Sequence, residues 1–174
     1  MLVISNNIKT INMPIPVDAV LRVNVAWIKN AKDLEKILNE TDKEIMIDYP
    51  FGRFKPPMPK ISIEDTLFIV NKCPKVHYFA ISNSELSIIM MGLRVLLRED
   101  IKIIPKIETV EGVLRVKEII KAAKTDTIML DKDDLYLDCK QSNDKLDAMV
   151  DRLDTSCGTK GIKILQLKGV IFHD

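Results

Sequence analysis

The sequence predicts an α/β fold, organised as a partial or reduced TIM-type (β/α) barrel with mostly parallel strands. Short apolar runs alternate along the chain with segments of helical periodicity, which is the pattern of a parallel α/β sheet. Two of the apolar runs end in charged residues, at Lys106–Glu108 and at Asp131–Asp138. Ligands bind at the carboxyl ends of strands in parallel sheets and barrels, so these strand ends predict a functional site.

The N-terminal segment, residues 1–19, has the weakest pattern. Too few residues separate residues 2–12 from the next strand to form a helical crossover, which needs a dozen or more. We therefore expect residues 2–12 to form an edge strand, a hairpin arm or a cap. The first clear strand is Val20–Ala26, which carries Leu, Val and Ala in an apolar run.

The next elements combine a helix cap, a strand and a loop. Asn30 is expected to cap a helix, with Asp33 near its third position, and Glu44–Asp48 is predicted as the second strand. Residues 50–60 contain four prolines, which remove backbone donors and exclude a helix or a central strand. This proline-rich segment is therefore predicted to be a loop.

From Ser62 onward, helices and strands alternate regularly. Ser62 with Asp65 signals the start of a helix that ends before Pro74. The predicted elements that follow are a strand at Val76–Ile81, a helix at Ser84–Leu97, a strand at Lys102–Ile107, a helix from about Val110 to Lys124, a strand at Thr127–Leu130, a helix at Ser142–Thr155, and a strand at Ile162–Leu167 that Gly169–Phe172 could continue.

The charged strand ends combine a lysine with carboxylates. Lys106 and Glu108 are alternate residues at the end of one strand, and Asp134 lies in the acidic segment after the next strand. Carboxylate oxygens suit Mg²⁺ and Mn²⁺, and a neighbouring lysine can hold a small anionic substrate. The pattern therefore predicts a divalent metal site. The alternative is an ion-pair network at the strand ends.

These residues also resemble a known family, pyruvate kinase. The matching segments are Lys106-Ile-Glu108 and Glu111-Gly-Val, then Asp134-Leu, and upstream Arg22-Val-Asn24 and the strand that ends at Asp48. They follow the order of the family's motifs, so the resemblance spans roughly residues 20–138. The resemblance implies that Glu108 and Asp134 bind Mg²⁺ or Mn²⁺. It further implies that Lys106 neutralises charge on an enolate and that Arg22 faces the substrate's phosphate.

The chain also departs from pyruvate kinase. Residues 50–60 stand where that family inserts its lid domain, and the C-terminal domain and the eighth strand have no counterpart. Asn24 and Asp48 match cation ligands beside the substrate, but Ala26 replaces the serine of that set, which leaves structural hydrogen bonding as the alternative. We therefore expect metal-dependent binding or enolate chemistry on a small oxo-acid such as pyruvate or phosphoenolpyruvate, without full pyruvate kinase activity.

Two other functions stay open. The Ile-Glu-Thr and Asp-Leu segments are also similar to the citrate-lyase β and hydroxy-acid aldolase group, which implies a carbon–carbon lyase with similar metal chemistry and no need for a lid. The other alternative is a non-catalytic interaction protein, because Asp133 and Tyr136 replace glycines of the pyruvate kinase pattern.

The proline-rich loop carries two further candidates for substrate binding. Arg53 and Lys55 could cover the strand ends and bind a phosphate or a carboxylate. The alternative is that both are solvated loop charges.

Composition narrows the class of protein and its partners. The 174 residues, 47% of them hydrophobic, are enough for one domain with a substantial core. The net charge of +1 without a basic block argues against nucleic acid and membrane surfaces as partners. Without a membrane span or a signal-peptide pattern, we expect a cytoplasmic protein. Because six clear strands cannot close an eight-stranded barrel, exposed strand edges predict a homo-oligomer, unless residues 2–12 fill the gap.

Overall fold

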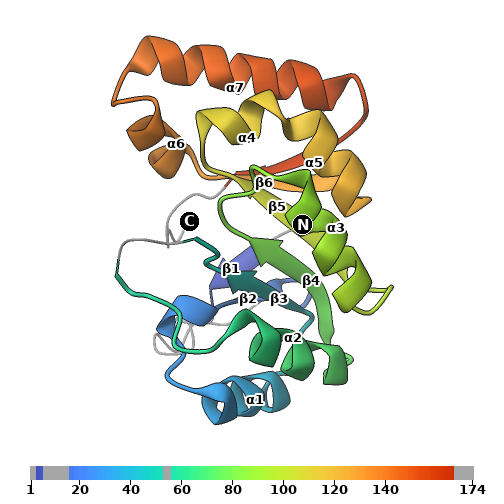
Figure 1. Cartoon of the computed structure of the whole chain (residues 1–174). Coiled ribbons are helices and arrows are strands. Elements are labelled where there is room, and N and C mark those ends of the chain that lie inside the picture. Colours follow the sequence, from blue (N-terminus) through green and yellow to red (C-terminus); the bar gives the residue numbers. More distant parts are fainter. Residues whose placement is uncertain (1–2, 6–15, 53–55, 167–174) are drawn as a thin grey trace.

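The computed structural model describes residues 3–5, 16–52 and 56–166, and these residues form an α/β fold. Seven parallel strands pair in sequence order, and the sheet curls into a partial barrel with the helices on its outer side (Figure 1). The strands are β1 (Val3–Ser5), β2 (Val20–Asn24), β3 (Ile45–Tyr49), β4 (Val76–Ile81), β5 (Lys102–Ile107), β6 (Thr127–Leu130) and β7 (Lys163–Gln166). The predicted fold class is confirmed.

The helices begin where their caps predict. Asn30 Oδ1 accepts a hydrogen bond from the backbone N–H of Asp33, and Ser62 Oγ accepts one from Asp65. Each cap satisfies a backbone donor of the first helical turn. The helices are α1 (Ala31–Glu40), α2 (Ile63–Lys72), α3 (Ser87–Leu96), α4 (Val110–Leu114), α5 (Val116–Ala123), α6 (Lys132–Asp138) and α7 (Asn143–Gly158), with a short 3-10 helix at Val25–Trp27.

The sheet has a hydrophobic cluster on each face. The larger cluster joins the strands to the helices and includes Val23, Ile47, Phe79 and Ile103, which are fully buried. The smaller cluster lies on the opposite, concave face and takes one buried side chain from each of β2 to β6: Val20, Met46, Ala80, Ile104 and Met129. Alternate residues of a strand point to opposite faces. On each strand, the side chain two residues after the one in this inner layer is therefore directed to the mouth of the partial barrel.

The structure selects one of the alternatives given for residues 2–12 and corrects two other sequence predictions. Residues Val3–Ser5 form an edge strand parallel to β2, as one of the alternatives for residues 2–12 proposed, while residues 6–15 and Gly169–Phe172 lie outside the described residues. The single helix predicted from Val110 to Lys124 is instead two helices, α4 and α5, with a break at Arg115; both helices contact α7, and α5 also packs on α3 and β5. The acidic segment after β6 is a helix, α6, which was not predicted.

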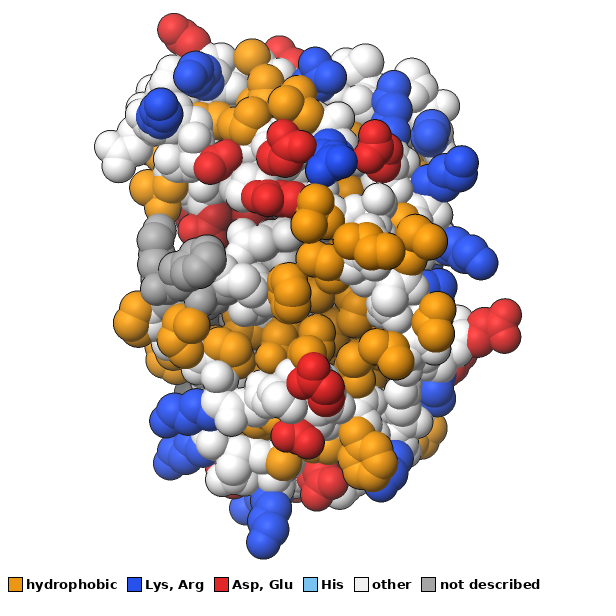
Figure 2. All heavy atoms as spheres, in the orientation of Figure 1, with side chains coloured by type: hydrophobic (Ala, Val, Ile, Leu, Met, Phe, Trp, Pro, Cys, Tyr) orange, Lys and Arg blue, Asp and Glu red, His pale blue; other side chains and the backbone are white. Residues whose placement is uncertain are grey.

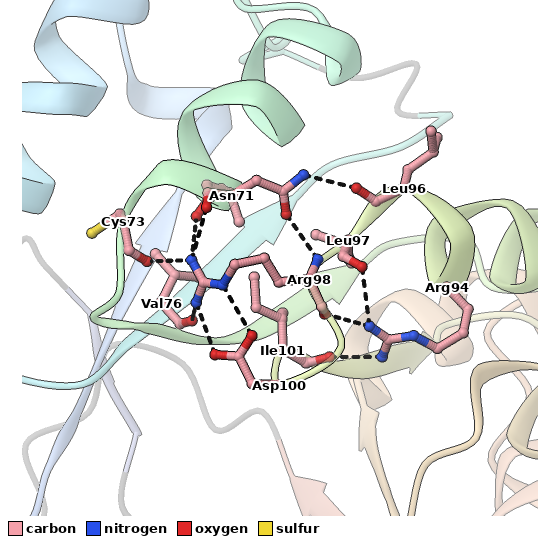
Figure 3. A network of polar contacts seen from close by, with 10 residues as sticks. Asn71, Cys73, Val76, Arg94, Leu96, Leu97, Arg98, Asp100 and Ile101 are labelled. Atoms are coloured by element: carbon pink, nitrogen blue, oxygen red, sulfur yellow. Dashed lines mark hydrogen bonds and ion pairs between the residues drawn. The ribbon is translucent and has the colours of Figure 1, made fainter.

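A polar network joins the loops at the amino ends of the strands, opposite the charged strand ends. The Arg98 guanidinium donates hydrogen bonds to the backbone carbonyls of Val70, Asn71, Cys73 and Val76, and it pairs with Asp100 at 2.9 Å (Figure 3). This arginine ties the α2–β4 loop to the α3–β5 loop. At this end of a barrel, such contacts serve stability. No helix in the described part of the chain is long and apolar enough to cross a membrane.

Candidate functional site

A cleft of about 730 Å³ opens at the carboxyl ends of the strands. Arg22 and Asn24 of β2 line it, together with Lys106 at the end of β5 and Phe51 and Gly52 of the loop after β3. Among the described residues that line the cleft, the acidic side chains outnumber the basic ones by five to two: Glu85, Glu108, Asp131, Asp134 and Asp138 against Arg22 and Lys106. This balance favours the binding of a cation.

Three of these carboxylates form a compact cluster. Glu108, Asp131 and Asp134 each offer a carboxylate oxygen, and these oxygens lie within 4.8 Å of one another. Glu108 follows β5 directly, while Asp131 follows β6 and caps α6 by accepting a hydrogen bond from the backbone N–H of Asp134 at 3.3 Å. The cluster therefore joins the ends of two neighbouring parallel strands, through a helix that begins beside the cleft.

Burial raises the pKa of two of these carboxylates. Burial raises the pKa of Glu108 above its usual value, although Lys106 and a hydrogen bond from Asn83 oppose the shift. Burial also raises the pKa of Asp131, and the neighbouring charges of Asp134 and Asp133 add to that shift. Carboxylates whose charge is disfavoured by burial and by one another are stabilised when a cation binds among them.

The donor set suits a hard divalent cation. Three carboxylates supply oxygen ligands only, and oxygen ligands suit Mg²⁺ and Mn²⁺ rather than a thiolate- or imidazole-bound metal. Asp134 is exposed toward the cleft, while Glu108 and Asp131 are buried, so the cluster is reached from one side. The residues present therefore fit a Mg²⁺ or Mn²⁺ ion.

Lys106 lies beside the cluster and is held on three sides. Its Nζ is 2.7 Å from Glu108 Oε1, donates a hydrogen bond to Ser82 Oγ at 3.0 Å, and lies 3.6 Å from Asp48 Oδ1. Burial alone would lower the pKa of Lys106, but the charges of Asp48 and Glu108 outweigh it and leave the pKa raised. The ammonium group is therefore a fixed positive charge in the cleft wall.

Arg22 is the second cation of the cleft, and Asp48 holds it. Arg22 Nε donates a hydrogen bond to Asp48 Oδ2 at 2.8 Å, and a second guanidinium nitrogen contacts the same oxygen. Asp48 is 1% exposed, and its Oδ1 has no hydrogen-bond partner among the described residues. One buried carboxylate thus lies between Arg22 and Lys106 and fixes the positions of both cations.

The structure brings together most of the residues that the sequence singled out. Arg22, Asn24, Lys106, Glu108 and Asp134 line one cleft. Asp48 lies behind Arg22 rather than in the described lining of the cleft, where its contacts are with the two cations. Asn24 Oδ1 accepts a hydrogen bond from the backbone N–H of Ala26 at 3.0 Å, so its carbonyl oxygen is used within the fold. Arg53 and Lys55 lie outside the described residues, and their role stays a prediction.

Sequence reasoning missed Ser82 and Asn83, and it included Asp131 only within the acidic segment after the strand, without naming it as a ligand. Ser82 and Asn83 follow β4 directly, so the strand-end rule that selected Lys106 would have found them. Asn83 has a φ of 50°, in the left-handed region that asparagine tolerates. From there its backbone N–H donates to Glu108 Oε2 at 2.8 Å, and its side-chain amide donates to the carbonyl of Phe51 at 2.8 Å. Asn83 thus orients Glu108.

Comparisons with known proteins decide between the two family resemblances. No match was found among curated protein sequences. The model of the HpcH/HpaI aldolase/citrate lyase family matches residues 4–166 of the chain. This match shows that the assignment to pyruvate kinase was wrong and that the similarity of Ile-Glu-Thr and Asp-Leu to the citrate-lyase and aldolase group was the correct one. The chain belongs to the HpcH/HpaI aldolase/citrate lyase family.

Proposed function

We propose that the chain is a divalent-metal-dependent carbon–carbon lyase that acts on a small hydroxy acid and produces or binds a small oxo-acid. The observation that carries the proposal is the cluster of Glu108, Asp131 and Asp134 beside the buried Lys106. Membership of an aldolase and citrate lyase family supports the reaction class. The predominance of acidic over basic side chains in the described lining of the cleft supports a cation as part of the site.

The metal would be Mg²⁺ or Mn²⁺, held by the three carboxylates. A bound divalent ion supplies Lewis-acid polarisation of the substrate's oxygen atoms. Lys106 adds a positive charge whose position is fixed by Glu108, Ser82 and Asp48. A fixed charge stabilises the negative charge that develops on the substrate oxygen during carbon–carbon cleavage, without reorganisation of the site.

Arg22 is the candidate for binding the substrate's carboxylate. Its Nε and one further nitrogen are engaged with Asp48, and the residue lines the cleft. A guanidinium with a fixed plane can still donate from its other edge to a carboxylate. Asp48 then has a supporting role: it orients Arg22 and Lys106 instead of contacting the ligand. Asn24 would contribute its side-chain amide at the same wall of the cleft.

Retro-aldol cleavage is the direct test of this proposal. The protein is incubated with Mn²⁺ or Mg²⁺ and panels of 3-hydroxy acids, their thioesters and 4-hydroxy-2-oxo acids, and released pyruvate or acetyl groups are measured. We expect turnover that requires the metal and that is lost in the double variant Glu108→Gln/Asp134→Asn. Glu85→Gln is the matched control, because Glu85 lines the cleft outside the carboxylate cluster. Metal-independent turnover, or equal activity in the double variant, would contradict the proposal.

A further inference from the structure

The outer face of α3 carries an apolar stripe that the described fold leaves uncovered. Exposed residues recur at the spacing of one helical face: Ile88, Met91, Gly92, Val95 and Leu96. The four large side chains are 66%, 54%, 85% and 58% exposed, in chain order. Figure 2 shows hydrophobic side chains gathered on this part of the surface, over α3 as placed in Figure 1.

The opposite face of the same helix is also apolar, so α3 is hydrophobic all round. Met90 and Leu93 are buried in the main core. The single charged residue of the helix, Arg94, directs its guanidinium to the backbone carbonyls of Leu97, Arg98 and Ile101 and so does not make the stripe polar (Figure 3). A helix that is hydrophobic on every side is normally buried, which indicates that the stripe has a partner.

Gly92 lies at the centre of the stripe, and the described fold provides no reason for a glycine there. A side chain built on Gly92 would meet no atom of the described residues within 4 Å. Its backbone is helical, and glycine is among the poorest helix formers. A central glycine on an exposed helical face allows the backbone of a second helix to approach closely.

We propose that the stripe is the contact surface for a second copy of this chain, with the two α3 helices crossing antiparallel at Gly92. An isologous contact requires a surface that complements itself, because residue i meets residue j and residue j meets residue i. Gly92 and the pair of Ile88 and Leu96 meet this condition. A twofold axis through Gly92 sets glycine against glycine and places Ile88 of each copy against Leu96 of the other.

The stripe covers part of the area that such a contact needs. A standard interface buries about 800 Å² from each partner. The four large side chains of the stripe, each more than half exposed, supply the apolar centre of such an interface, and the polar residues around them would form its rim. Leu86, at the N-terminal end of the helix, is 45% exposed and extends the apolar surface toward the cleft. The inference does not depend on the proposed lyase activity.

Sedimentation velocity across a dilution series tests the proposal. The wild type is expected to show a concentration-dependent dimer. Val95→Glu and Gly92→Gln should each raise the dimer dissociation constant more than about tenfold, since each removes or blocks a central apolar contact. Gly92→Gln should at the same time raise the melting temperature of the monomer, because glutamine is the better helix former and has open space there. Val17→Glu is the matched control, because Val17 is 91% exposed and lies outside the stripe.

A cross-link tests the crossing point itself. Gly92→Cys should form a disulfide-linked dimer under mild oxidation, whereas Val17→Cys should not, and the native Cys73, Cys139 and Cys157 are buried. A wild type that stays monomeric at every concentration overturns the proposal. So does a dimer that both Val95→Glu and Gly92→Gln leave unchanged, which would place the interface elsewhere. Absence of the cross-link in a dimeric Gly92→Cys variant would refute the antiparallel crossing.

Discussion

Lys106 Nζ lies 2.7 Å from Glu108 Oε1, and both side chains are about 5% exposed. The two residues are separated by one position at the end of β5, so their side chains leave the strand on the same side. Glu108 therefore has two tasks: it is a candidate metal ligand and the partner of a buried cation. This pairing decides how variants of the site should behave.

Removal of Glu108 should destabilise the protein even without metal. Glu108→Ala leaves Lys106 buried with Asp48 as its remaining charged partner, at 3.6 Å. Breaking a buried ion pair from one side costs several kcal/mol, and we expect a loss of about 2 kcal/mol in the free energy of unfolding because Asp48 offsets part of the cost. Urea denaturation in the presence of a chelator measures it. The double variant Lys106→Met/Glu108→Leu should recover much of the loss, and an unchanged stability of Glu108→Ala would contradict the role of the pair.

Removal of the Asp131 charge, in contrast, should stabilise the metal-free protein. Its raised pKa means that the folded state holds the proton more tightly than the unfolded state, so the stability of the metal-free protein falls as the pH rises through the folded pKa. Asp131→Asn keeps a good helix cap and removes the charge. We expect this variant to be more stable than the wild type at neutral pH and to lose the decline. Thermal melts across the acidic to neutral range check this, with the exposed Asp147→Asn in α7 as a control; equal pH profiles for wild type and Asp131→Asn would refute it.

The affinity for metal should rise with pH over the acidic range. Burial raises the pKa of Glu108 and of Asp131, so protons compete with the cation at both ligands until the pH exceeds these values. Mn²⁺ binding at acidic pH should therefore release protons. Calorimetry in two buffers of different ionisation enthalpy measures that release. A Mn²⁺ affinity that does not change with pH would show that neither carboxylate is a ligand.

The Arg98 network should matter for stability and not for the site. Arg98 satisfies four backbone carbonyls at the amino ends of the strands, at the opposite end of the sheet from the cleft (Figure 3). Arg98→Ala should lower the free energy of unfolding by about 2–4 kcal/mol, because several partly buried acceptors lose their donor. Arg115→Ala is the control, since Arg115 makes only long, exposed ion pairs with Glu111 and Glu118 among the described residues, and it should change stability by less than about 1 kcal/mol. Equal losses in the two variants would contradict this prediction.

The strands were the most predictable part of the fold. Val76–Ile81, Lys102–Ile107 and Thr127–Leu130 agree with the structure to the residue, because each is a short apolar run bounded by polar residues. Helix α6 was missed because helical periodicity is hard to detect in seven residues. Most of these residues are polar or charged, and Leu135 is its buried residue. Asp131 was not identified as a ligand for the same reason, since its place beside Glu108 depends on the turn into that helix.

The site was predictable in position and less so in detail. Strand ends meet at one edge of a parallel sheet, so Lys106, Glu108 and Asp134 could be grouped from the sequence alone. The role of Asp48 could not be predicted from its place at a strand end. Its carboxylate binds Arg22 and Lys106, and that arrangement depends on how β3 lies beside β2. The reaction class was also ambiguous, since short Lys-x-Glu and Asp-Leu motifs resemble two families. Only the match over residues 4–166 separates them.

The central claim is that Glu108, Asp131 and Asp134 bind one divalent ion, which then recruits an oxo-acid. Mn²⁺ titration of the protein, with and without oxalate as an oxo-acid analogue, tests it most directly. We predict saturable binding of one Mn²⁺ per chain, tightened by oxalate, abolished in Asp134→Asn and retained in Glu85→Gln. Asp134 is exposed and its variant should remain folded, so the loss can be assigned to the ligand itself. Absence of saturable binding in the wild type, or equal binding in Asp134→Asn, would contradict the claim.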